Sequence, residues 1–297
     1  MANIPVKKLK NGFQLPVFGF GTWQMGGREK RDASNDDRAD IRAIQKALDM
    51  GITHIDTAAW YAQGHTEELV GQAIKGRDRA KILVTTKVSP MDLNYKDVLR
   101  SAGDSLKRLG TDYIDIYVIH NPNPYIEISQ TMQAMDKLLK DGLVRHLGLS
   151  NFNISQFKQA QGYSCNNIVC NHLHYNLKHR GPLLDGTIKF CQDNGIMVVA
   201  WRPVQKGLFS EGRFQILKKL AQKYEKTQNQ IAINWLVSQK NVVTISKTRN
   251  IGHLVENIGS LGFKMEPGDI RLLMEDFPDK VATVENVTLA KLIEKKR

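Results

Sequence analysis

The stretch Ile-Thr-His-Ile-Asp-Thr (52–57) contains the pattern on which the fold prediction depends. It is a short run of apolar and β-branched residues, which is typical of a buried strand. Upstream, apolar residues recur with the period of an amphipathic helix, at Ile41, Ile44, Ala47 and Leu48. Ser34 and Asn35 can cap the start of this helix, and Gly51 can end it. The segment therefore predicts one α/β unit, in which a helix leads into a strand.

The same kind of strand run occurs eight times along the chain, and amphipathic stretches separate the runs. The eight runs are residues 16–23, 52–57, 82–87, 114–120, 144–150, 168–175, 196–203 and 242–247. A second helical stripe ends at Gly110 and comprises Val98, Leu99, Ala102, Leu106 and Leu109. Eight such repeats in roughly 250 residues predict an α/β fold of the (β/α)8 TIM-barrel type.

An open, doubly wound sheet is the alternative architecture for alternating strands and helices. Its dinucleotide fingerprint, Gly-x-Gly-x-x-Gly leading into a helix, is missing from this chain. Gly-Phe-Gly (19–21) is followed by Thr-Trp-Gln (22–24), and no third glycine arrives in register. This favours the barrel.

The domain organisation is simple. Residues 7–16 contain Lys-Asn-Gly between apolar residues, which indicates a hairpin ahead of the first repeat. No low-complexity tract or Pro/Gly/Ser-rich linker divides the chain. We therefore expect a single domain over residues 1–297, with an N-terminal β-hairpin at about 7–16, a barrel at about 17–260 and a C-terminal extension at about 261–297.

Composition excludes several classes of protein. The 297 residues are 41% hydrophobic and 24% charged, as in ordinary globular proteins. No apolar run approaches the roughly 20 residues that span a bilayer, and the first residues lack the apolar stretch of a signal peptide. Cys165, Cys170 and Cys191 match no zinc-binding spacing. We expect a soluble, cytoplasmic protein with reduced thiols and no membrane partner.

The net charge of +12 raises the question of nucleic-acid binding. The excess of Lys and Arg lies mainly at the two ends of the chain, in residues 1–31 and 280–297. This distribution argues against a basic face on the folded body, so we expect no nucleic-acid partner. The sequence carries no signal for the oligomeric state.

Polar residues end most of the strand runs, and the carboxyl ends of the strands form the active site of a TIM barrel. These terminal residues are Trp23, Asp56, Lys87, His120, Ser150 with Asn151, His172 with His174, Trp201 and Lys247. Single residues have structural alternatives, since Asp56 can cap a helix and Lys87 can extend to solvent. Their combination at one end of a barrel points instead to a catalytic crevice.

Three of these side chains, together with Tyr61, fit one mechanism. Tyr61 follows Asp56 by five positions, so its phenol can reach the same mouth. A phenol has a pKa of about 10 and needs help to donate a proton near neutral pH. Lys87 would lower that pKa, Asp56 would keep the lysine charged, and His120 could bind a substrate oxygen. The set suits protonation of a carbonyl oxygen during hydride transfer.

Six motifs carry a resemblance to a known family. They are Gly-Phe-Gly-Thr-Trp (19–23), Ile-Asp-Thr-Ala-Ala-Trp-Tyr (55–61), Thr-Thr-Lys (85–87), Ile-His-Asn-Pro (119–122), Gly-Leu-Ser-Asn-Phe (148–152) and Ile-Ser-Lys-Thr (245–248). In this order and spacing they resemble the aldo-keto reductase superfamily, from about Leu9 to Pro267. The resemblance implies NADPH-dependent reduction of an aldehyde or ketone, with a small-molecule carbonyl compound as the partner.

The resemblance also implies residue roles. Tyr61 would be the general acid, Lys87 and Asp56 would tune it, and His120 would orient the carbonyl; Trp23, Trp60 and His120 would line the substrate pocket. NADP(H), with NAD(H) as an alternative, would lie across the barrel mouth. Its expected contacts are Gly21, Thr22, Trp23, Asp56, Ser150, Asn151, His172, Trp201, Arg202, Pro203, Val204, Lys206, Gly207, Leu208, Ser246, Lys247, Thr248, Arg249, His253, Glu256 and Asn257.

Two positions depart from the family pattern. His172 stands where a glutamine usually completes the clamp on the nicotinamide carboxamide, and we expect protonation of this histidine to make cofactor affinity pH-sensitive. His253 replaces the arginine expected to bind the adenosine 2′-phosphate, and Arg249 is the residue that could compensate. We therefore expect an NADPH preference weaker than the family norm.

Two other functions are alternatives to carbonyl reduction. His172-x-His174 could begin a metal site in a barrel hydrolase, but the next strand runs end in Trp201 and Lys247, which are poor ligands. A non-catalytic NADP-binding subunit or sensor is the third reading, and the complete Asp, Tyr, Lys and His set argues against it. No sequence motif identifies the physiological carbonyl substrate or predicts the path of the basic C-terminal tail.

Overall fold

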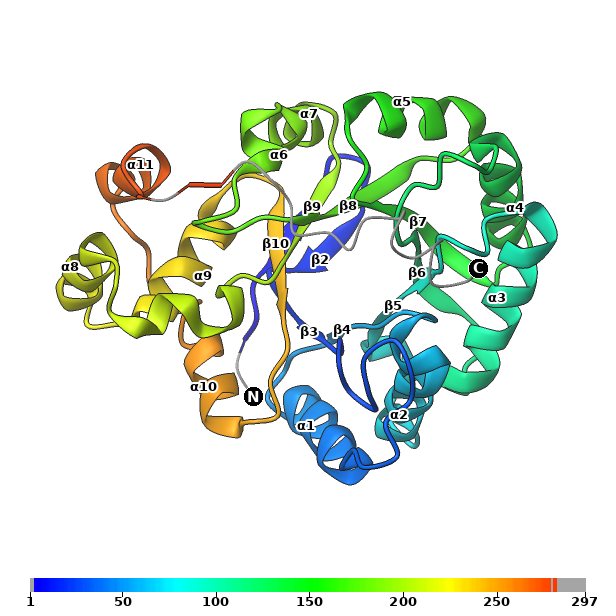
Figure 1. Ribbon diagram of the computed structural model, residues 1–297, viewed down its shortest axis with the longest axis horizontal. Helices are drawn as coiled ribbons and strands as arrows, with labels where there is room; N and C mark the ends of the chain where they lie inside the picture. The colour runs from blue at the N-terminus through cyan, green and yellow to red at the C-terminus, as the bar shows by residue number, and fades with distance from the viewer. Residues whose placement is uncertain (1–2, 279, 282–297) are drawn as a thin grey trace.

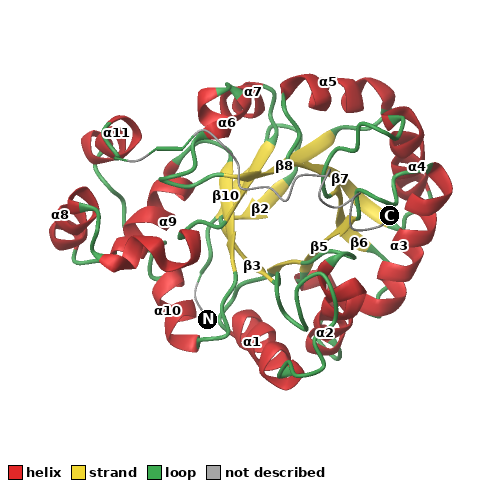
Figure 2. Ribbon diagram, viewed as in Figure 1, coloured by secondary structure: helices red, strands yellow, loops and turns green. Residues whose placement is uncertain are grey.

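Eight parallel strands close into a barrel, and helices surround it (Figures 1 and 2). The computed structural model describes residues 3–278 and 280–281. The barrel strands are β3 (Phe18–Gly21), β4 (His54–Asp56), β5 (Leu83–Val88), β6 (Ile114–Ile119), β7 (Val144–Ser150), β8 (Ile168–His174), β9 (Met197–Trp201) and β10 (Val242–Ser246). β10 pairs with both β9 and β3, which closes the barrel and confirms the fold prediction.

Helices form an outer ring around these strands, and Figure 2 shows α8 and α11 farthest from them. The long helices are α1 (Asp37–Asp49), α2 (His65–Ile74), α3 (Tyr95–Leu109), α4 (Ile128–Lys140), α5 (Ile154–Tyr163), α8 (Gln215–Tyr224), α9 (Gln228–Ser238), α10 (Ile251–Ile258) and α11 (Pro267–Glu275). Shorter elements are η1 (Tyr61–Gly64), η2 (Arg79–Lys81), α6 (Gly181–Leu184), α7 (Thr187–Asp193) and η3 (Gln205–Glu211). Among the described residues, no helix is both long and apolar enough to cross a bilayer.

An N-terminal hairpin closes one end of the barrel. β1 (Val6–Lys8) pairs antiparallel with β2 (Gln14–Pro16), as the Lys-Asn-Gly turn predicts. Leu9, Phe13 and Leu15 pack in one apolar cluster with inward-facing barrel residues such as Val118 and Val243. Lys7 anchors the hairpin by donating a 2.7 Å hydrogen bond to the carbonyl of Val242, at the start of β10. The hairpin therefore covers the amino ends of the strands and leaves their carboxyl ends open.

The helix ends differ slightly from the sequence prediction. Asp36, not Ser34 or Asn35, is the N-cap of α1, because its side chain accepts a hydrogen bond from the amide of Ala39. Gly110 ends α3 in the left-handed conformation, as predicted. α11 lies within the predicted C-terminal extension, whereas most of the basic tail from Lys280 falls outside the described residues.

Candidate active site

A cavity of about 300 Å³ opens at the carboxyl ends of the strands. Most of the site residues predicted from the sequence line this cavity, and they lie at or near the carboxyl ends of the barrel strands. They are Gly21, Thr22, Trp23, Asp56, Trp60, Tyr61, Lys87, His120, Ser150, Asn151, His172, Trp201, Arg202, Pro203, Val204, Lys206, Ser246 and Lys247. The cavity is therefore the candidate active site.

Asp56 and Lys87 form a buried ion pair at the ends of β4 and β5. Nζ of Lys87 lies 2.5 Å from Oδ1 of Asp56 and donates a 2.8 Å hydrogen bond to the carbonyl of Thr57. Burial lowers the pKa of Lys87, but Asp56 and Tyr61 more than offset this effect, so the pKa lies above its usual value. Burial raises the pKa of Asp56, and Lys87 opposes that rise. The pair thus holds a charged ammonium at the bottom of the cavity.

Tyr61 stands over this ammonium at the start of η1. Nζ of Lys87 lies 5.3 Å from the centre of the phenol ring, and the ring of Trp23 packs against the phenol with centroids 4.8 Å apart. Lys87 lowers the pKa of Tyr61, as expected, but burial raises it by more. The net shift in the free protein is therefore upward, opposite to the lowering that the sequence suggested. The reason is that burial of the phenol cannot be read from the spacing of charged residues.

His120 completes the group from the end of β6. Its ring lies 5.5 Å from that of Tyr61 and 5.7 Å from that of Trp60, centroid to centroid. Burial and the charge of Lys87 hold the pKa of His120 well below its usual value, so the imidazole is neutral near pH 7. Its buried Nδ1 has no hydrogen-bond partner among the described residues. The structure thus brings the four predicted residues together.

Ser150, Asn151 and His172 lie side by side on the neighbouring strands β7 and β8, and Nδ1 of His172 lies 3.5 Å from Oδ2 of Asp56. Ser150 is paired in register with His172 across β7 and β8, and the amide of Asn151 donates to the His172 carbonyl at 2.8 Å. Burial, together with the charge of Lys87, keeps the pKa of His172 far below its usual value. The imidazole of the free protein is therefore neutral near pH 7. Burial of the ring, which is 1% exposed, argues against the predicted pH-sensitive cofactor affinity, which stays a prediction for binding measurements.

Trp201 ends β9 and lines the cavity. The ring of His174 stacks on it, with centroids 4.2 Å apart, and His179 stacks on the other side of His174 at 4.0 Å. Nε2 of His174 lies 3.1 Å from the side-chain oxygen of Gln205. His174 thus supports Trp201 instead of joining His172 at a common site. Within residues 3–278 and 280–281, no three His, Cys, Asp or Glu side chains gather as metal ligands would.

Two loops bring positive charge to the mouth. Arg202, Pro203, Val204 and Lys206 from the β9–η3 segment line the cavity, whereas the predicted contacts Gly207 and Leu208 do not. At the end of β10, Ser246 and the following Lys247 line the cavity, whereas five predicted contacts lie outside its wall: Thr248, Arg249, His253, Glu256 and Asn257. The protein therefore offers cations along one side of the opening.

The outlying residues after β10 are engaged in contacts of their own. Glu256 accepts a 2.6 Å hydrogen bond from the hydroxyl of Thr227, and Asn257 donates to Ser246 at 3.4 Å. His253 is exposed on α10. Arg249, the expected substitute for the missing arginine, binds the carboxylate of Asp40 on α1, with Nε 2.5 Å from Oδ1. Compensation by Arg249 therefore has to compete with this ion pair.

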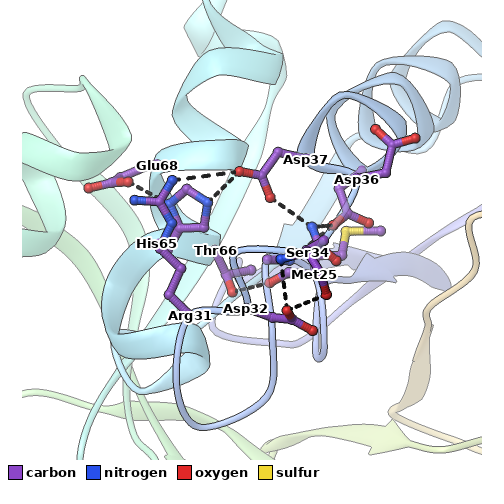
Figure 3. A network of polar contacts seen from close by, with 12 residues as sticks. Met25, Arg31, Asp32, Ser34, Asp36, Asp37, His65, Thr66 and Glu68 are labelled. Carbon is purple, nitrogen blue, oxygen red and sulfur yellow. Dashed lines mark hydrogen bonds and ion pairs between the residues drawn. The ribbon is translucent and has the colours of Figure 1, made fainter.

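The loop between β3 and α1 is fastened to the start of α2 (Figure 3). Thr66 donates a 2.6 Å hydrogen bond to the carbonyl of Met25. The His65 ring lies between two carboxylates, with Nε2 2.7 Å from Asp37 and Nδ1 2.7 Å from Glu68. Because His65 directly follows η1, these contacts fix the segment that carries Tyr61 relative to the loop that carries Trp23.

Four further residues line the cavity without having been predicted: Gln24, Glu29, Asn121 and Ile245. Gln24 and Asn121 each directly follow a predicted strand-end residue, and this position in the sequence could have identified them as cavity residues. Ile245 lies inside a predicted strand run. Glu29 lies in the long β3–α1 segment, where no periodic pattern marks the residues that fold over the mouth.

Comparisons with known proteins agree with this geometry. The model of the aldo/keto reductase family matches residues 17–275. Methylglyoxal reductase YeaE of Escherichia coli is 30% identical over 268 residues, which cover 89% of this chain and 92% of the enzyme. Both matches thus extend over most of the chain.

Solved structures show the same likeness. The thermostable aldo-keto reductase Tm1743, solved with the inhibitor epalrestat, is 40% identical, with a TM-score of 0.87 over 91% of this chain and 98% of that protein. An aldo/keto reductase from Klebsiella pneumoniae, solved with NADP and acetate, is 31% identical, with a TM-score of 0.82 over 93% of this chain and 97% of that one. The chain therefore belongs to the aldo/keto reductase family and is a TIM-barrel oxidoreductase.

Proposed function

We propose that this protein reduces an aldehyde or ketone to an alcohol with NADPH, and that Tyr61 supplies the proton. The observation that carries the proposal is the grouping of Tyr61, Lys87, Asp56 and His120 at the bottom of one cavity. Family membership supports the reaction class. The NADP-bound relative from Klebsiella pneumoniae supports the cofactor.

The cavity walls suit a nicotinamide dinucleotide. The buried Nε2 of His172 has no hydrogen-bond partner among the described residues, whereas Nδ1 lies 3.5 Å from Oδ2 of Asp56; the ring lies beside Ser150 and Asn151. A carboxamide has both donors and acceptors, so it could satisfy such a group. Arg202, Lys206 and Lys247 supply charge for the phosphates. When bound there, NADPH would supply the hydride, and Trp201 would support the ring by stacking.

The chain's own residues would handle the proton. In our proposal the phenol of Tyr61 donates its proton to the carbonyl oxygen as that oxygen gains negative charge. The ammonium of Lys87 stabilises the phenolate that is left, and Asp56 keeps this ammonium in place. The neutral ring of His120 offers an N–H that can orient the carbonyl oxygen toward Tyr61. No covalent intermediate is needed.

The wall of the pocket favours compact or flat carbonyl compounds. Trp23, Trp60 and His120 surround Tyr61 with aromatic surface. Such surface binds apolar and aromatic groups. The relative from Escherichia coli is named a methylglyoxal reductase, so we include small dicarbonyl compounds in the proposed substrate class.

A carbonyl panel tests the proposal. Purified protein would be incubated with methylglyoxal, glyoxal, aliphatic aldehydes and aromatic aldehydes, with NADPH and NADH in parallel, while the absorbance of the reduced nicotinamide is followed. We expect consumption of NADPH with at least one aldehyde. Binding of NADPH without turnover of any carbonyl would instead favour the non-catalytic subunit, and the absence of binding would reject both readings.

A further inference from the structure

Arg249 is bound on two sides by α1 and the loop before it. Its Nε lies 2.5 Å from Oδ1 of Asp40, and its Nη2 lies 2.9 Å from Oδ2, which is a bidentate pair. Nη2 also donates to the side-chain oxygen of Asn35. The Asp40 carboxylate is fully buried and accepts further hydrogen bonds from the amide of Gly26 at 3.0 Å and from Nδ2 of Asn35 at 2.8 Å. The pair is therefore built into the loop that leads from β3 to α1.

This ion pair stands next to the cationic edge of the cavity. Arg249 follows Lys247, which lines the cavity, by two positions. Burial lowers the pKa of Lys247, and the charge of Arg249 lowers it further, so the two cations are close enough to interact. The side chain of Arg249 is 39% exposed. Within the part of the chain that the structure describes, its Nη1 has no hydrogen-bond partner.

We propose that Asp40 sets how strongly this protein distinguishes NADPH from NADH, by neutralising Arg249 and holding the guanidinium edge that could otherwise bind the 2′-phosphate. This inference rests on the proposed function and concerns a residue outside the cavity wall. With His253 in place of the expected arginine, Arg249 is the nearest guanidinium to Lys247 in sequence.

The charge balance explains the proposed effect. A phosphate gains most from a guanidinium that presents two parallel N–H groups. Asp40 already accepts hydrogen bonds from Nε and Nη2 of Arg249, and Asn35 accepts a second one from Nη2. Only Nη1 is then left to donate to an incoming anion. The carboxylate also repels a nearby dianion, so the Arg249–Asp40 pair contributes little net attraction. In the wild type, the preference for NADPH over NADH then depends mainly on Lys247.

The variant Asp40→Asn tests the proposal with little change in shape. The amide oxygen can occupy the position of Oδ2 and keep the hydrogen bonds from Gly26 and from Nη2 of Arg249. The amide nitrogen then faces Nε of Arg249 and cannot accept its hydrogen bond, so the guanidinium loses this contact and its neutralising charge. Dissociation constants would be measured by calorimetry for NADPH and NADH, and for 2′,5′-ADP and 5′-ADP, at low salt. We expect Asp40→Asn to increase the preference for the 2′-phosphate by about three- to tenfold, and salt to reduce this gain.

Asp36→Asn is the matched control. It removes the same charge from an exposed carboxylate one turn away, and asparagine retains the N-cap of α1. We expect its preference for the 2′-phosphate to stay within about twofold of the wild type, because water and salt screen exposed charges. Thermal unfolding of each variant verifies that the proteins compared are folded.

The double variant Asp40→Asn/Arg249→Met completes the test. Because it removes both charges, its preference should return to near the wild-type value, and this result would support Arg249 as the group that Asp40 controls. An unchanged or reduced preference in folded Asp40→Asn would overturn the proposal. So would a double variant that keeps the full gain of Asp40→Asn. If the wild type binds neither NADPH nor NADH, the proposed function itself fails.

Discussion

Nζ of Lys87 lies 5.3 Å from the centre of the Tyr61 ring, beneath the cavity at the barrel mouth. Two opposing effects therefore act on the phenol: burial raises its pKa, and the ammonium lowers it. Burial prevails, so the phenol keeps its proton in the free protein near neutral pH. A protonated donor held over a fixed cation is the arrangement that carbonyl protonation requires.

Tyr61→Phe removes the hydroxyl that we propose as the proton donor and little else. We expect kcat for aldehyde reduction to fall by about 10² or more, the usual cost of losing a general acid, while NADPH binding is retained. Tyr125→Phe is the control, since Tyr125 is 78% exposed and should behave as wild type. Steady-state kinetics with NADPH in excess make the comparison. Turnover within a few-fold of wild type would remove Tyr61 from the mechanism.

Lys87→Met and Asp56→Asn should differ in severity. Methionine removes the ammonium that stabilises the phenolate in our proposal, so we expect kcat to fall by about 10² or more. Asparagine keeps an acceptor for Nζ of Lys87 at the same position, so we expect a loss of only about tenfold. Both values come from the same kinetic assay, with melting temperatures measured alongside. The reverse order would show that Asp56, and not Lys87, acts on the phenol.

The contrast between local and distant relationships explains what the sequence could predict. The eight strand runs and the residues at their ends follow from local periodicity, and the barrel topology then brings Asp56, Lys87 and His120 to one mouth. The pair of Arg249 with Asp40 joins residues 209 positions apart, and no local pattern records it.

Burial was the other quantity that the sequence did not contain. The shift in the pKa of Tyr61 and the neutrality of His172 both depend on how completely neighbouring elements exclude water. Residues that fold over the mouth from an irregular segment, such as Glu29, also lack a sequence signal. Charge partners were therefore predictable from chemistry, whereas their environment required the packed structure.

Buried histidines should make the protein sensitive to acid. The pKa of His54 and that of His174 are lowered to about 3, mainly by burial, and that of His172 also lies far below its usual value. Unfolded histidine binds a proton below about pH 6.5, and the folded rings do not. Their contribution to stability is thus complete above about pH 6.5 and is lost as the pH falls toward the folded values, by about 1.4 kcal/mol per pH unit for each ring.

His172→Gln isolates one of these rings. The free energy of unfolding, measured with urea, should fall less between pH 7 and 5 in the variant than in the wild type. The difference in slope should correspond to the uptake of one proton fewer on unfolding. The exposed His253 provides the control, and His253→Gln should leave the slope unchanged. The NADPH dissociation constants of wild type and His172→Gln should follow the same pH dependence from pH 5 to 8. A slope that is equal in all three proteins would place a protonated ring at position 172.

The ion pair of Glu67 with Arg108 should matter for stability more than for catalysis. Glu67 is fully buried on α2, accepts 2.7 Å and 2.6 Å contacts from Nε and Nη2 of Arg108 on α3, and accepts a hydrogen bond from Thr86 on β5 at 2.5 Å. Arg108→Met leaves a buried carboxylate without its cation, so we expect a loss of about 3–5 kcal/mol in the free energy of unfolding at pH 7.

Removing both charges tests whether the unpaired carboxylate is the cause. In Glu67→Leu/Arg108→Met neither charge of this pair remains, so we expect the double variant to unfold at a higher urea concentration than Arg108→Met alone. Lys87 and Tyr61 keep their own contacts in this variant, so kcat of the folded double variant should stay within a few-fold of wild type. A double variant less stable than Arg108→Met would mean that Glu67 holds α2 against β5 chiefly through Thr86, independently of the arginine.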